Sequence, residues 1–182
     1  MQHHDQKTSS RPSLIKAVIL ADSLTLSNIQ RALTPNDDEW GAVLTGPVWK
    51  QLRCVTNSYA VEPLRQSQVY FQATARSWLD TMISIREFGS FVTAIAHSHP
   101  GWSAAASTPS GEDIRYLSDL QKKCGSKAIG IIVTRANNDG VAYVRFYSVH
   151  VPFSVRVVGE HIEQLEKSAY EYVYRLSIPQ NN

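Results

Sequence analysis

The segment HSHPGWSAAASTPSGED holds side chains whose types and spacing suit metal chemistry. Two of the six histidines in the chain, His97 and His99, stand one residue apart, and Asp113 follows after a loop of small residues. On a β-strand the side chains of residues i and i+2 point to the same face, so both imidazoles can be directed at one point. Zn²⁺ accepts histidine nitrogen and carboxylate oxygen, and a catalytic zinc site uses three protein ligands. We therefore expect Asp113 to be the third ligand of a metal site.

The end of this segment, from Ser110 to Asp113, also has the pattern of a helix N-terminus. Ser110 would be the N-cap of a capping box, with Asp113 in the place of the usual Glu. That position lies in the first helical turn, where the positive end of the helix dipole keeps a carboxylate ionised. Hydrogen-bonded histidines beside a plain capping box are the alternative to a metal site. Pro100 and Pro109 favour the metal site, because they stiffen the two ends of the loop.

The elements that would position these residues follow from the periodicity of the apolar side chains. The apolar segment 90–99 is expected to be a strand that runs into the histidines, and 110–125 a helix. Further strands are expected at 14–20, 39–46, 51–61 and 67–73, further helices at 22–33, 75–89 and 159–177, and a hairpin with the turn NNDG at 127–150. This order predicts an α/β fold with a mixed, mainly antiparallel β-sheet flanked by helices.

The overall composition is that of a single domain without strong charge. The 182 residues carry a formal net charge of +2, which favours neither a nucleic acid nor a membrane as partner. No apolar run reaches about 18 residues, and the polar N-terminus lacks the apolar centre of a secretory signal. His3 and His4 are assigned to a disordered tail. Cys54 and Cys124 are isolated, so we expect reduced thiols, a cytoplasmic location and no zinc site built from cysteines.

Two motifs together resemble the JAMM signature of zinc isopeptidases, also called MPN+ or JAB. That signature reads His-x-His-Pro, a loop and Pro-Ser-x-x-Asp, as in HSHP and PSGED here. The family also carries an upstream Glu-x-x-Gly-hydrophobic-x-x-Gly motif, which EWGAVLTG matches from Glu39 to Gly46 with Ala42 in the place of Gly. The resemblance covers residues 14–150. It implies a JAB/MPN domain with a layered, cytidine-deaminase-like fold, which we place at 14–178 behind a disordered tail at 1–13.

The sequence departs from the family pattern in the loop between His99 and Asp113. Thirteen residues separate them, three more than the family usually has, and residues 102–107 are the expected insertion. We expect this insertion to bulge into solvent or towards substrate, with Ser110 and Asp113 kept in place. The longer loop leaves Glu112 as the rival metal ligand.

The resemblance implies a role for each matching residue. His97, His99 and Asp113 would bind one Zn²⁺ per chain, which lowers the pKa of a water molecule. Glu39 would be the general base that takes a proton from that water and passes it to the leaving amine. Ser110 would donate a hydrogen bond to the developing oxyanion. The neighbouring Asp37 and Asp38 are the competing carboxylates for the role of Glu39.

The family typically cleaves after the C-terminal glycine of a ubiquitin-like protein, either at an isopeptide bond to lysine or in a linear precursor. Trp102 borders the metal motif, so it either forms one wall of a substrate groove or only anchors its loop. The extended substrate tail could pair with an exposed strand edge. The chain resembles a stand-alone prokaryotic, deubiquitinase-like isopeptidase of this family. Its implied partners are a ubiquitin-like protein or its conjugate and E1-like and E2-like proteins of the same operon, including antiphage operons.

Three other functions compete with this interpretation. A RadC-like relative of undefined role shares the pattern TPS-x-x-D with TPSGED at 108–113. The register of Glu39 with Gly46 in the upstream JAMM motif argues against this relative. A catalytically inactive MPN scaffold would typically lack one or more ligands, whereas all are present here. A nucleic-acid-binding protein is supported only by the mild positive charge.

Overall fold

A computed structural model describes residues 17–67, 70–123 and 127–178. The helices are α1 (Ser23–Leu33), α2 (Ala75–Glu87), α3 (Gly111–Lys123) and the short 3₁₀ helix η1 (Ala105–Ser107). The strands are β1 (Ala17–Asp22), β2 (Gly41–Gly46), β3 (Val48–Trp49), β4 (Leu52–Cys54), β5 (Asn57–Ala60), β6 (Pro63–Ser67), β7 (Tyr70–Ala73), β8 (Phe91–His99), β9 (Ile129–Thr134), β10 (Val141–Tyr147), β11 (Phe153–Val158), β12 (Ile162–Lys167) and β13 (Glu171–Ser177). The tail expected at 1–13 and the thiol of Cys124 lie outside the described residues.

The strands form a large mixed sheet, as the sequence predicts. The seven-stranded sheet has the order β12-β13-β10-β9-β8-β2-β5, and its described pairs are antiparallel apart from β8 with β9. A second sheet has the order β11-β1-β4-β3, and β6 pairs with β7 in a separate hairpin. The hairpin expected around the turn NNDG is confirmed, because β9 and β10 are antiparallel neighbours.

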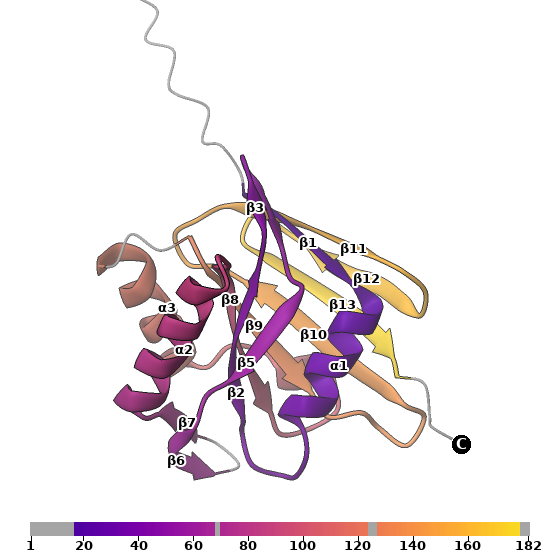
Figure 1. Ribbon diagram of the computed structural model, residues 1–182. Coiled ribbons are helices and arrows are strands. Elements are labelled where there is room, and N and C mark those ends of the chain that lie inside the picture. Colours follow the sequence, from indigo (N-terminus) through magenta and orange to yellow (C-terminus); the bar gives the residue numbers. More distant parts are fainter. Residues whose placement is uncertain (1–16, 68–69, 124–126, 179–182) are drawn as a thin grey trace, which may run out of the picture.

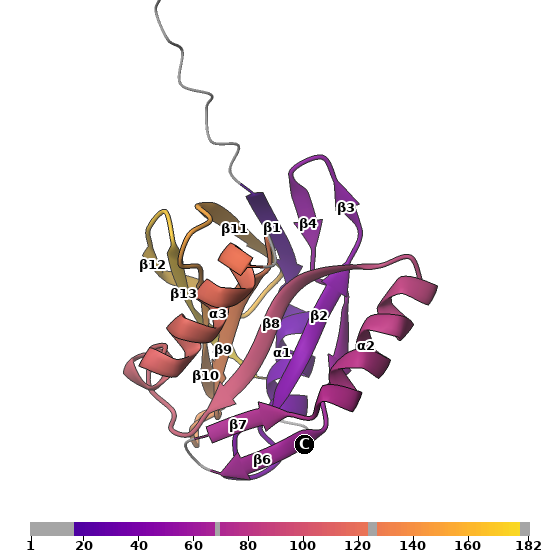
Figure 2. The ribbon, with the colours of Figure 1, turned by 90° about the vertical axis from the view of Figure 1, so that its left-hand side faces the viewer.

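Helices cover both faces of the seven-stranded sheet. Figure 1 shows α1 on one side of β2 and β8 and α2 and α3 on the other, and Figure 2 looks onto the face where α2 and α3 lie on either side of β8. The alternation of side chains follows these layers. Ala96 is buried in the core shared with α1, whereas Ile95 packs with residues of α2. His97, two residues after Ile95, therefore points to the α2 and α3 side.

The ends of α1 and α2 are fixed by local hydrogen bonds that the sequence signals. Asp22 is the N-cap of α1 and accepts from the backbone N–H of Thr25 at 2.8 Å. Thr74 caps α2 and accepts from the N–H of Ser77 at 3.0 Å. Gly89 follows the last residues of α2 with φ of +62°, a conformation that glycine adopts without steric strain.

The prediction of a closing helix over residues 159–177 is wrong. These residues form β12 and β13, which are antiparallel, and β13 continues the sheet beside β10. Tyr172, Tyr174 and Leu176 alternate along β13 and enter the main core. The glutamate-rich composition of the segment favours a helix locally. The open edge of β10 and the burial of these alternating side chains outweigh that preference.

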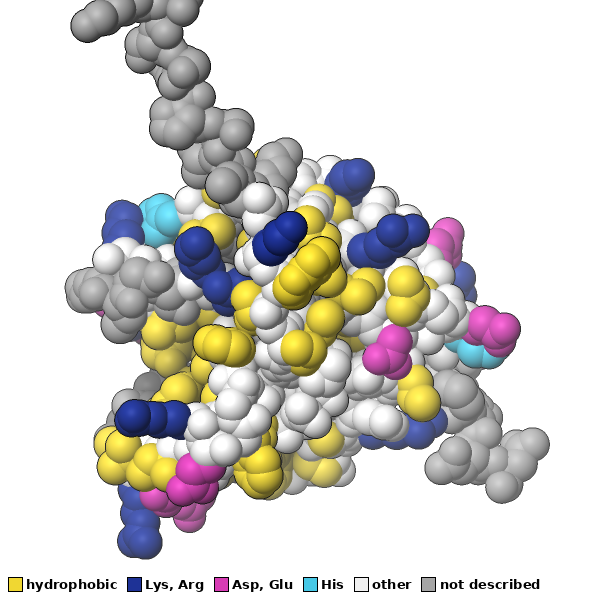
Figure 3. Space-filling view, turned by 45° about the horizontal axis from the view of Figure 1, so that its top comes forward, with side chains coloured by type: hydrophobic (Ala, Val, Ile, Leu, Met, Phe, Trp, Pro, Cys, Tyr) yellow, Lys and Arg dark blue, Asp and Glu magenta, His cyan; other side chains and the backbone are white. Residues whose placement is uncertain are grey.

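The described surface carries scattered charges. On the face drawn in Figure 3, Lys and Arg side chains are separated by hydrophobic and uncharged side chains. Among the helices in the described ranges, none is both long and apolar enough to cross a membrane.

Candidate metal centre

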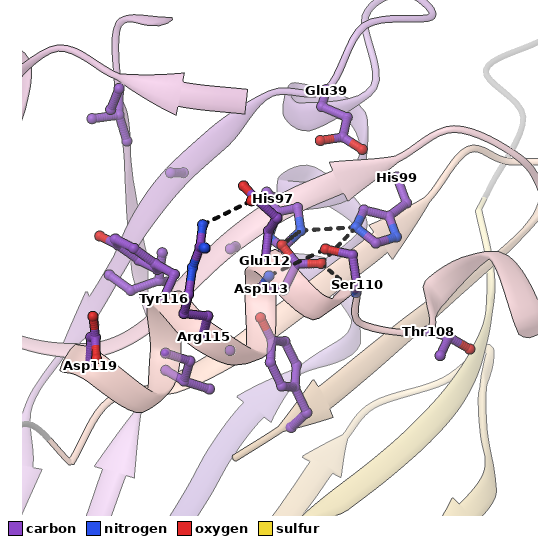
Figure 4. A pocket seen from close by; sticks show the side chains of 18 of the residues that line it. Glu39, His97, His99, Thr108, Ser110, Glu112, Asp113, Arg115, Tyr116 and Asp119 are labelled. Carbon is purple, nitrogen blue, oxygen red and sulfur yellow. Dashed lines mark hydrogen bonds and ion pairs between the residues drawn. The ribbon is translucent and has the colours of Figure 1, made fainter. Parts of the chain in front are cut away.

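The predicted metal ligands come together where β8 ends and α3 begins. His97 and His99 project from the same face of β8, and the first turn of α3 places Asp113 opposite them (Figure 4). The Nε2 atom of His97 lies 3.1 Å from Asp113 Oδ1, and the Nε2 atom of His99 lies 3.3 Å from Asp113 Oδ2. The two Nε2 atoms are 3.0 Å apart. Three potential ligand atoms therefore face one small region.

These distances fit a single metal ion. A tetrahedral ion with bonds of 2.0–2.1 Å to nitrogen and oxygen holds neighbouring ligand atoms about 3.3 Å apart. The three separations of 3.0–3.3 Å are close to that value, but the two histidines contact different oxygens of Asp113. With one ligand atom taken from each residue, all three atoms lie within 4.8 Å of one another. Two imidazoles and one carboxylate form a ligand set that suits zinc and other divalent transition metals. With three protein ligands, a tetrahedral ion would keep one position open for water or substrate.

The ring of His99 is oriented by the loop that follows it. Its Nδ1 atom lies 3.0 Å from the backbone carbonyl oxygen of Ala106. A carbonyl oxygen can only accept, so Nδ1 carries the hydrogen of this bond. Nε2 is then the nitrogen that faces the cluster and is available as a ligand. Such an outer hydrogen bond fixes the tautomer and the direction of a metal-binding imidazole.

The capping box at the start of α3 holds Asp113 in place. The N–H of Ser110 donates to Asp113 Oδ2 at 2.7 Å, and the N–H of Asp113 donates to Ser110 Oγ at 3.2 Å. The two interpretations of this segment are thus compatible, because the same carboxylate caps the helix and faces both histidines. Burial alone would raise the pKa of Asp113, but hydrogen bonds from His97, His99 and Ser110 hold it far below its ordinary value.

Glu39 reaches the cluster through the pairing of β2 with β8. Gly41 is the partner of His97 in this antiparallel pair, and the pairing extends beyond it through Trp40 and Ser98. The N–H of Trp40 donates to Ser98 Oγ and the N–H of Ser98 donates to the carbonyl of Trp40, both at 2.9 Å. This register places Glu39 opposite His99, on the same face of the sheet.

The environment of Glu39 suits a proton acceptor. The residue is only 8% exposed, and its carboxylate is directed towards the imidazoles in Figure 4. Burial raises the pKa of Glu39 above its ordinary value, although the histidines His99 and His97 oppose this shift; the charge of Asp113 adds to it. A carboxylate with a raised pKa holds a proton more readily near neutral pH than an ordinary glutamate does.

The competing carboxylates are not part of the ligand cluster, although Glu112 lines the cavity in front of it. Glu112 forms an exposed ion pair with Arg115, at 2.8 Å between Oε1 and a guanidinium nitrogen, and the cluster of possible ligands contains Asp113 instead. Asp37 pairs with Arg135. Neither Asp37 nor Asp38 lines the cavity over the cluster, whereas Glu39 does.

A cavity of about 770 Å³ opens in front of the cluster and is lined by residues from β2, β8, α2 and α3. Trp102 is 60% exposed and is not among its lining residues, while Trp78 and Tyr147 are. The sequence analysis did not single out these two aromatic residues. For Tyr147 a signal exists, because Gly130 interrupts the apolar strand IGIIVT and an added Cβ there would lie 2.2 Å from the ring of Tyr147. A glycine inside a strand often marks such a close approach.

The loop insertion at 102–107 was expected to bulge away from the domain. In the structure only part of it projects into solvent. Trp102 is exposed, but Ser107 is completely buried and η1 packs against β9 and β10. The physical reason is the polar side chain of Arg145 beneath the loop, which donates to its oxygen atoms.

Comparisons with known proteins agree with this architecture. A family model described as prokaryotic homologs of the JAB domain matches residues 23–149, more than half of the chain. The solution structure of protein DSY2949 from Desulfitobacterium hafniense is similar, with 22% sequence identity, coverage of 78% of this chain and 94% of that chain, and a TM-score of 0.57. At this identity the likeness shows the fold alone. No curated protein matches the chain.

Proposed function

The chain belongs to the prokaryotic JAB-domain family, and we propose that it is a zinc-dependent peptidase that cleaves after the C-terminus of a ubiquitin-like protein. The observation that carries this proposal is the buried carboxylate of Glu39 beside the cluster of His97, His99 and Asp113. A cluster of ligands alone could serve a structural metal. A neighbouring base with a raised pKa, in a cavity large enough for a peptide, is what hydrolysis requires.

The proposed reaction needs metal ligands, a general base and a hydrogen-bond donor, and the chain has a residue for each role. His97, His99 and Asp113 would hold zinc, which, when bound, supplies a Lewis acid that makes water nucleophilic near neutral pH. Glu39 accepts the proton of the attacking water as its oxygen bonds to the carbonyl carbon. The C–N bond then breaks, and Glu39 returns the proton to the leaving amine. Ser110 Oγ lies 3.2 Å from the N–H of Asp113 and lines the cavity, so its hydroxyl would donate to the oxyanion of the substrate in place of Asp113.

The surroundings of the cavity support a peptide tail as substrate. Val61 and Trp78 line it, and β5, which precedes Val61, is the last strand at that edge of the seven-stranded sheet. An extended tail could add to this edge by main-chain hydrogen bonds while its terminal carbonyl lies at the cluster. We place the tail on the Trp78 side of the cavity, because Trp102 lies outside the lining. Deconjugation and precursor processing use the same chemistry. A conjugation system with E1-like and E2-like proteins, such as one with an antiphage role, would supply either substrate.

The experiment that tests this function uses the zinc-loaded protein and a ubiquitin-like protein from the same operon, fused through its C-terminus to a reporter. We expect cleavage at the junction that a chelator abolishes. Glu39→Gln should retain zinc and lose about 10²–10⁴-fold in rate. An active Glu39→Gln variant would show that another group is the base. Cleavage of unrelated short peptides at an equal rate would contradict the substrate, because the folded modifier would then contribute no binding energy to the transition state.

A further inference from the structure

Arg145, in the middle of β10, is buried close to the metal centre and has no role in the reaction proposed above. It is 6% exposed and lies on the same face of the strand as Tyr147, which lines the cavity. A buried guanidinium needs both a charge partner and acceptors for its N–H groups. Arg145 finds its charge partner in Glu171 of β13, with Glu166 of β12 at 3.8 Å.

The remaining donors of Arg145 hold the loop that carries η1. Its Nε donates to Ser107 Oγ at 3.2 Å, and its second terminal nitrogen donates to the carbonyl oxygen of Ala104 at 3.2 Å. Ser107 Oγ in turn donates to the same carbonyl at 2.7 Å. Two residues, Ala105 and Ala106, lie between these two anchor points, and the carbonyl of Ala106 accepts the hydrogen from His99 Nδ1 at 3.0 Å.

We propose that Arg145 is a positioning residue of the metal centre, acting on His99 through the backbone of η1. The inference rests on the proposed function, since His99 is the ligand that it orients. The planar guanidinium presents its donors at fixed angles, so the loop oxygens at Ala104 and Ser107 are held in one arrangement. The Ala106 carbonyl is thereby kept where it selects the tautomer with Nε2 facing the metal.

This arrangement links the metal centre to a part of the chain beyond the matched family domain. The family model ends at residue 149, whereas Glu166 and Glu171 lie on β12 and β13. The loop held by Arg145 is also the one that is longer than the family pattern. The C-terminal hairpin thus supplies the negative charge that allows a buried arginine to secure the longer loop.

The test compares zinc affinity in the full chain with Arg145→Lys. Lysine keeps the positive charge beside Glu171 but cannot reach Ser107 and Ala104 with two donors at once. We expect the zinc Kd, measured by competition with a chromogenic chelator, to rise about 10–100-fold. The absorption spectrum of the Co²⁺-loaded protein should also change, because the orientation of one ligand changes. Arg175→Lys is the matched control, since Arg175 pairs with Glu163 at 3.6 Å on the exposed side of β13 and should leave both readouts unchanged.

The outcomes separate this inference from the proposed function. A purely structural role for Arg145 would lower the melting temperature but leave the zinc Kd and the Co²⁺ spectrum of the folded protein as they are, and that result would overturn the inference. If Arg145→Lys does not fold, Ser107→Ala decides the matter: it removes one acceptor and should weaken zinc binding towards the lower end of the same range, and an unchanged Kd would overturn the inference. A wild-type chain that binds no zinc would defeat both.

Discussion

Helices α1 and α3 each have an aspartate at the N-terminal end that accepts a backbone N–H, yet only one of these carboxylates belongs to a cluster of potential metal ligands. Asp22 is itself the N-cap of α1, and both of its oxygens are used by Thr25, whose N–H lies at 2.8 Å and whose hydroxyl lies at 2.6 Å. Asp113 is the last residue of the capping box of α3, three residues after Ser110. It accepts one N–H from Ser110 and keeps a lone pair on each oxygen for the histidines.

The difference shows what turns a capping carboxylate into a candidate ligand. Both carboxylates have a pKa below the ordinary value of aspartate despite the opposing effect of burial. For Asp22 the opposing interactions are hydrogen bonds within its own helix end. For Asp113 they come mainly from His97 and His99 on the separate element β8. Both aspartates take part in a helix cap. Only Asp113 also accepts hydrogen bonds from donors on another element, and this distinguishes it from Asp22.

The largest expected effect that tests this comparison is the loss of zinc in Asp113→Asn. Asparagine can still accept the N–H of Ser110 and so keeps the helix cap, but it removes the anionic ligand. We expect zinc affinity to fall by more than the roughly 100-fold typical of an outer hydrogen-bond partner, with the circular dichroism spectrum preserved. Zinc content after gel filtration measures this.

Two variants serve as controls for that result. Asp22→Asn changes the equivalent helix end and should retain one zinc per chain. Glu112→Gln changes the neighbouring carboxylate and should also retain it. Stoichiometric zinc in Asp113→Asn together with its loss in Glu112→Gln would assign the third ligand to Glu112.

The next effect concerns Ser110, which combines a cap with a proposed catalytic role. Ser110→Ala should lower the free energy of unfolding by about 1 kcal/mol, since it removes the oxygen that accepts from Asp113. It should also slow cleavage of the modifier fusion by about 10²–10³-fold in kcat, because the oxyanion loses a donor. Ser110→Thr keeps the hydroxyl and should restore most of the stability. A fully active Ser110→Ala enzyme would reduce Ser110 to a helix cap.

A smaller effect is expected at the other helix end. Asp22→Ala removes both hydrogen bonds to Thr25 and should lower the free energy of unfolding by about 1 kcal/mol, which corresponds to a decrease of roughly 2–4 °C in Tm for a chain of this size. Zinc affinity should stay at the wild-type value. A change in zinc affinity would mean that the two helix ends are coupled and that the comparison fails.

The smallest effect is a difference in acid sensitivity. A carboxylate whose pKa is lower in the folded than in the unfolded state stabilises the protein above its unfolded pKa of about 3.9, and this contribution is lost as the pH falls through the folded pKa. The metal-free protein should therefore lose stability in acid, and both Asp22→Asn and Asp113→Asn should flatten this decline. The flattening should be greater for Asp113→Asn, because its pKa is shifted further. Urea midpoints between pH 5 and pH 2 measure it, because the two contributions are lost below the unfolded pKa, and an equal slope in all three proteins would contradict it.

Much of the fold and of the metal cluster could be predicted because their signals are local. The spacing of His97 and His99 on an apolar strand fixes their common face, and the Ser-x-x-Asp pattern fixes Asp113 in the first turn of α3. The resemblance to the JAB family is confirmed by the family match. The match of Glu39 to Gly46 with the upstream family motif singled out Glu39 as the general base. The structure buries this residue beside the histidines, two residues before β2, and its catalytic role stays a prediction.

The sequence by itself determined the three potential ligands, the mixed sheet that carries them and the family, because strand alternation, capping and turn chemistry act over a few residues. The tertiary structure alone decided the last two strands, the side of the cavity that is lined by Trp78, and the burial of Arg145 beneath η1. Each of these depends on partners distant along the chain: β10 for β13, α2 for the cavity, and Glu171 for Arg145. Local propensity favours a helix at 159–177, and the burial of apolar side chains beside β10 reverses that preference. An arginine in a strand is ordinarily solvated, and Arg145 can be buried because Glu171 from a distant segment pairs with its charge.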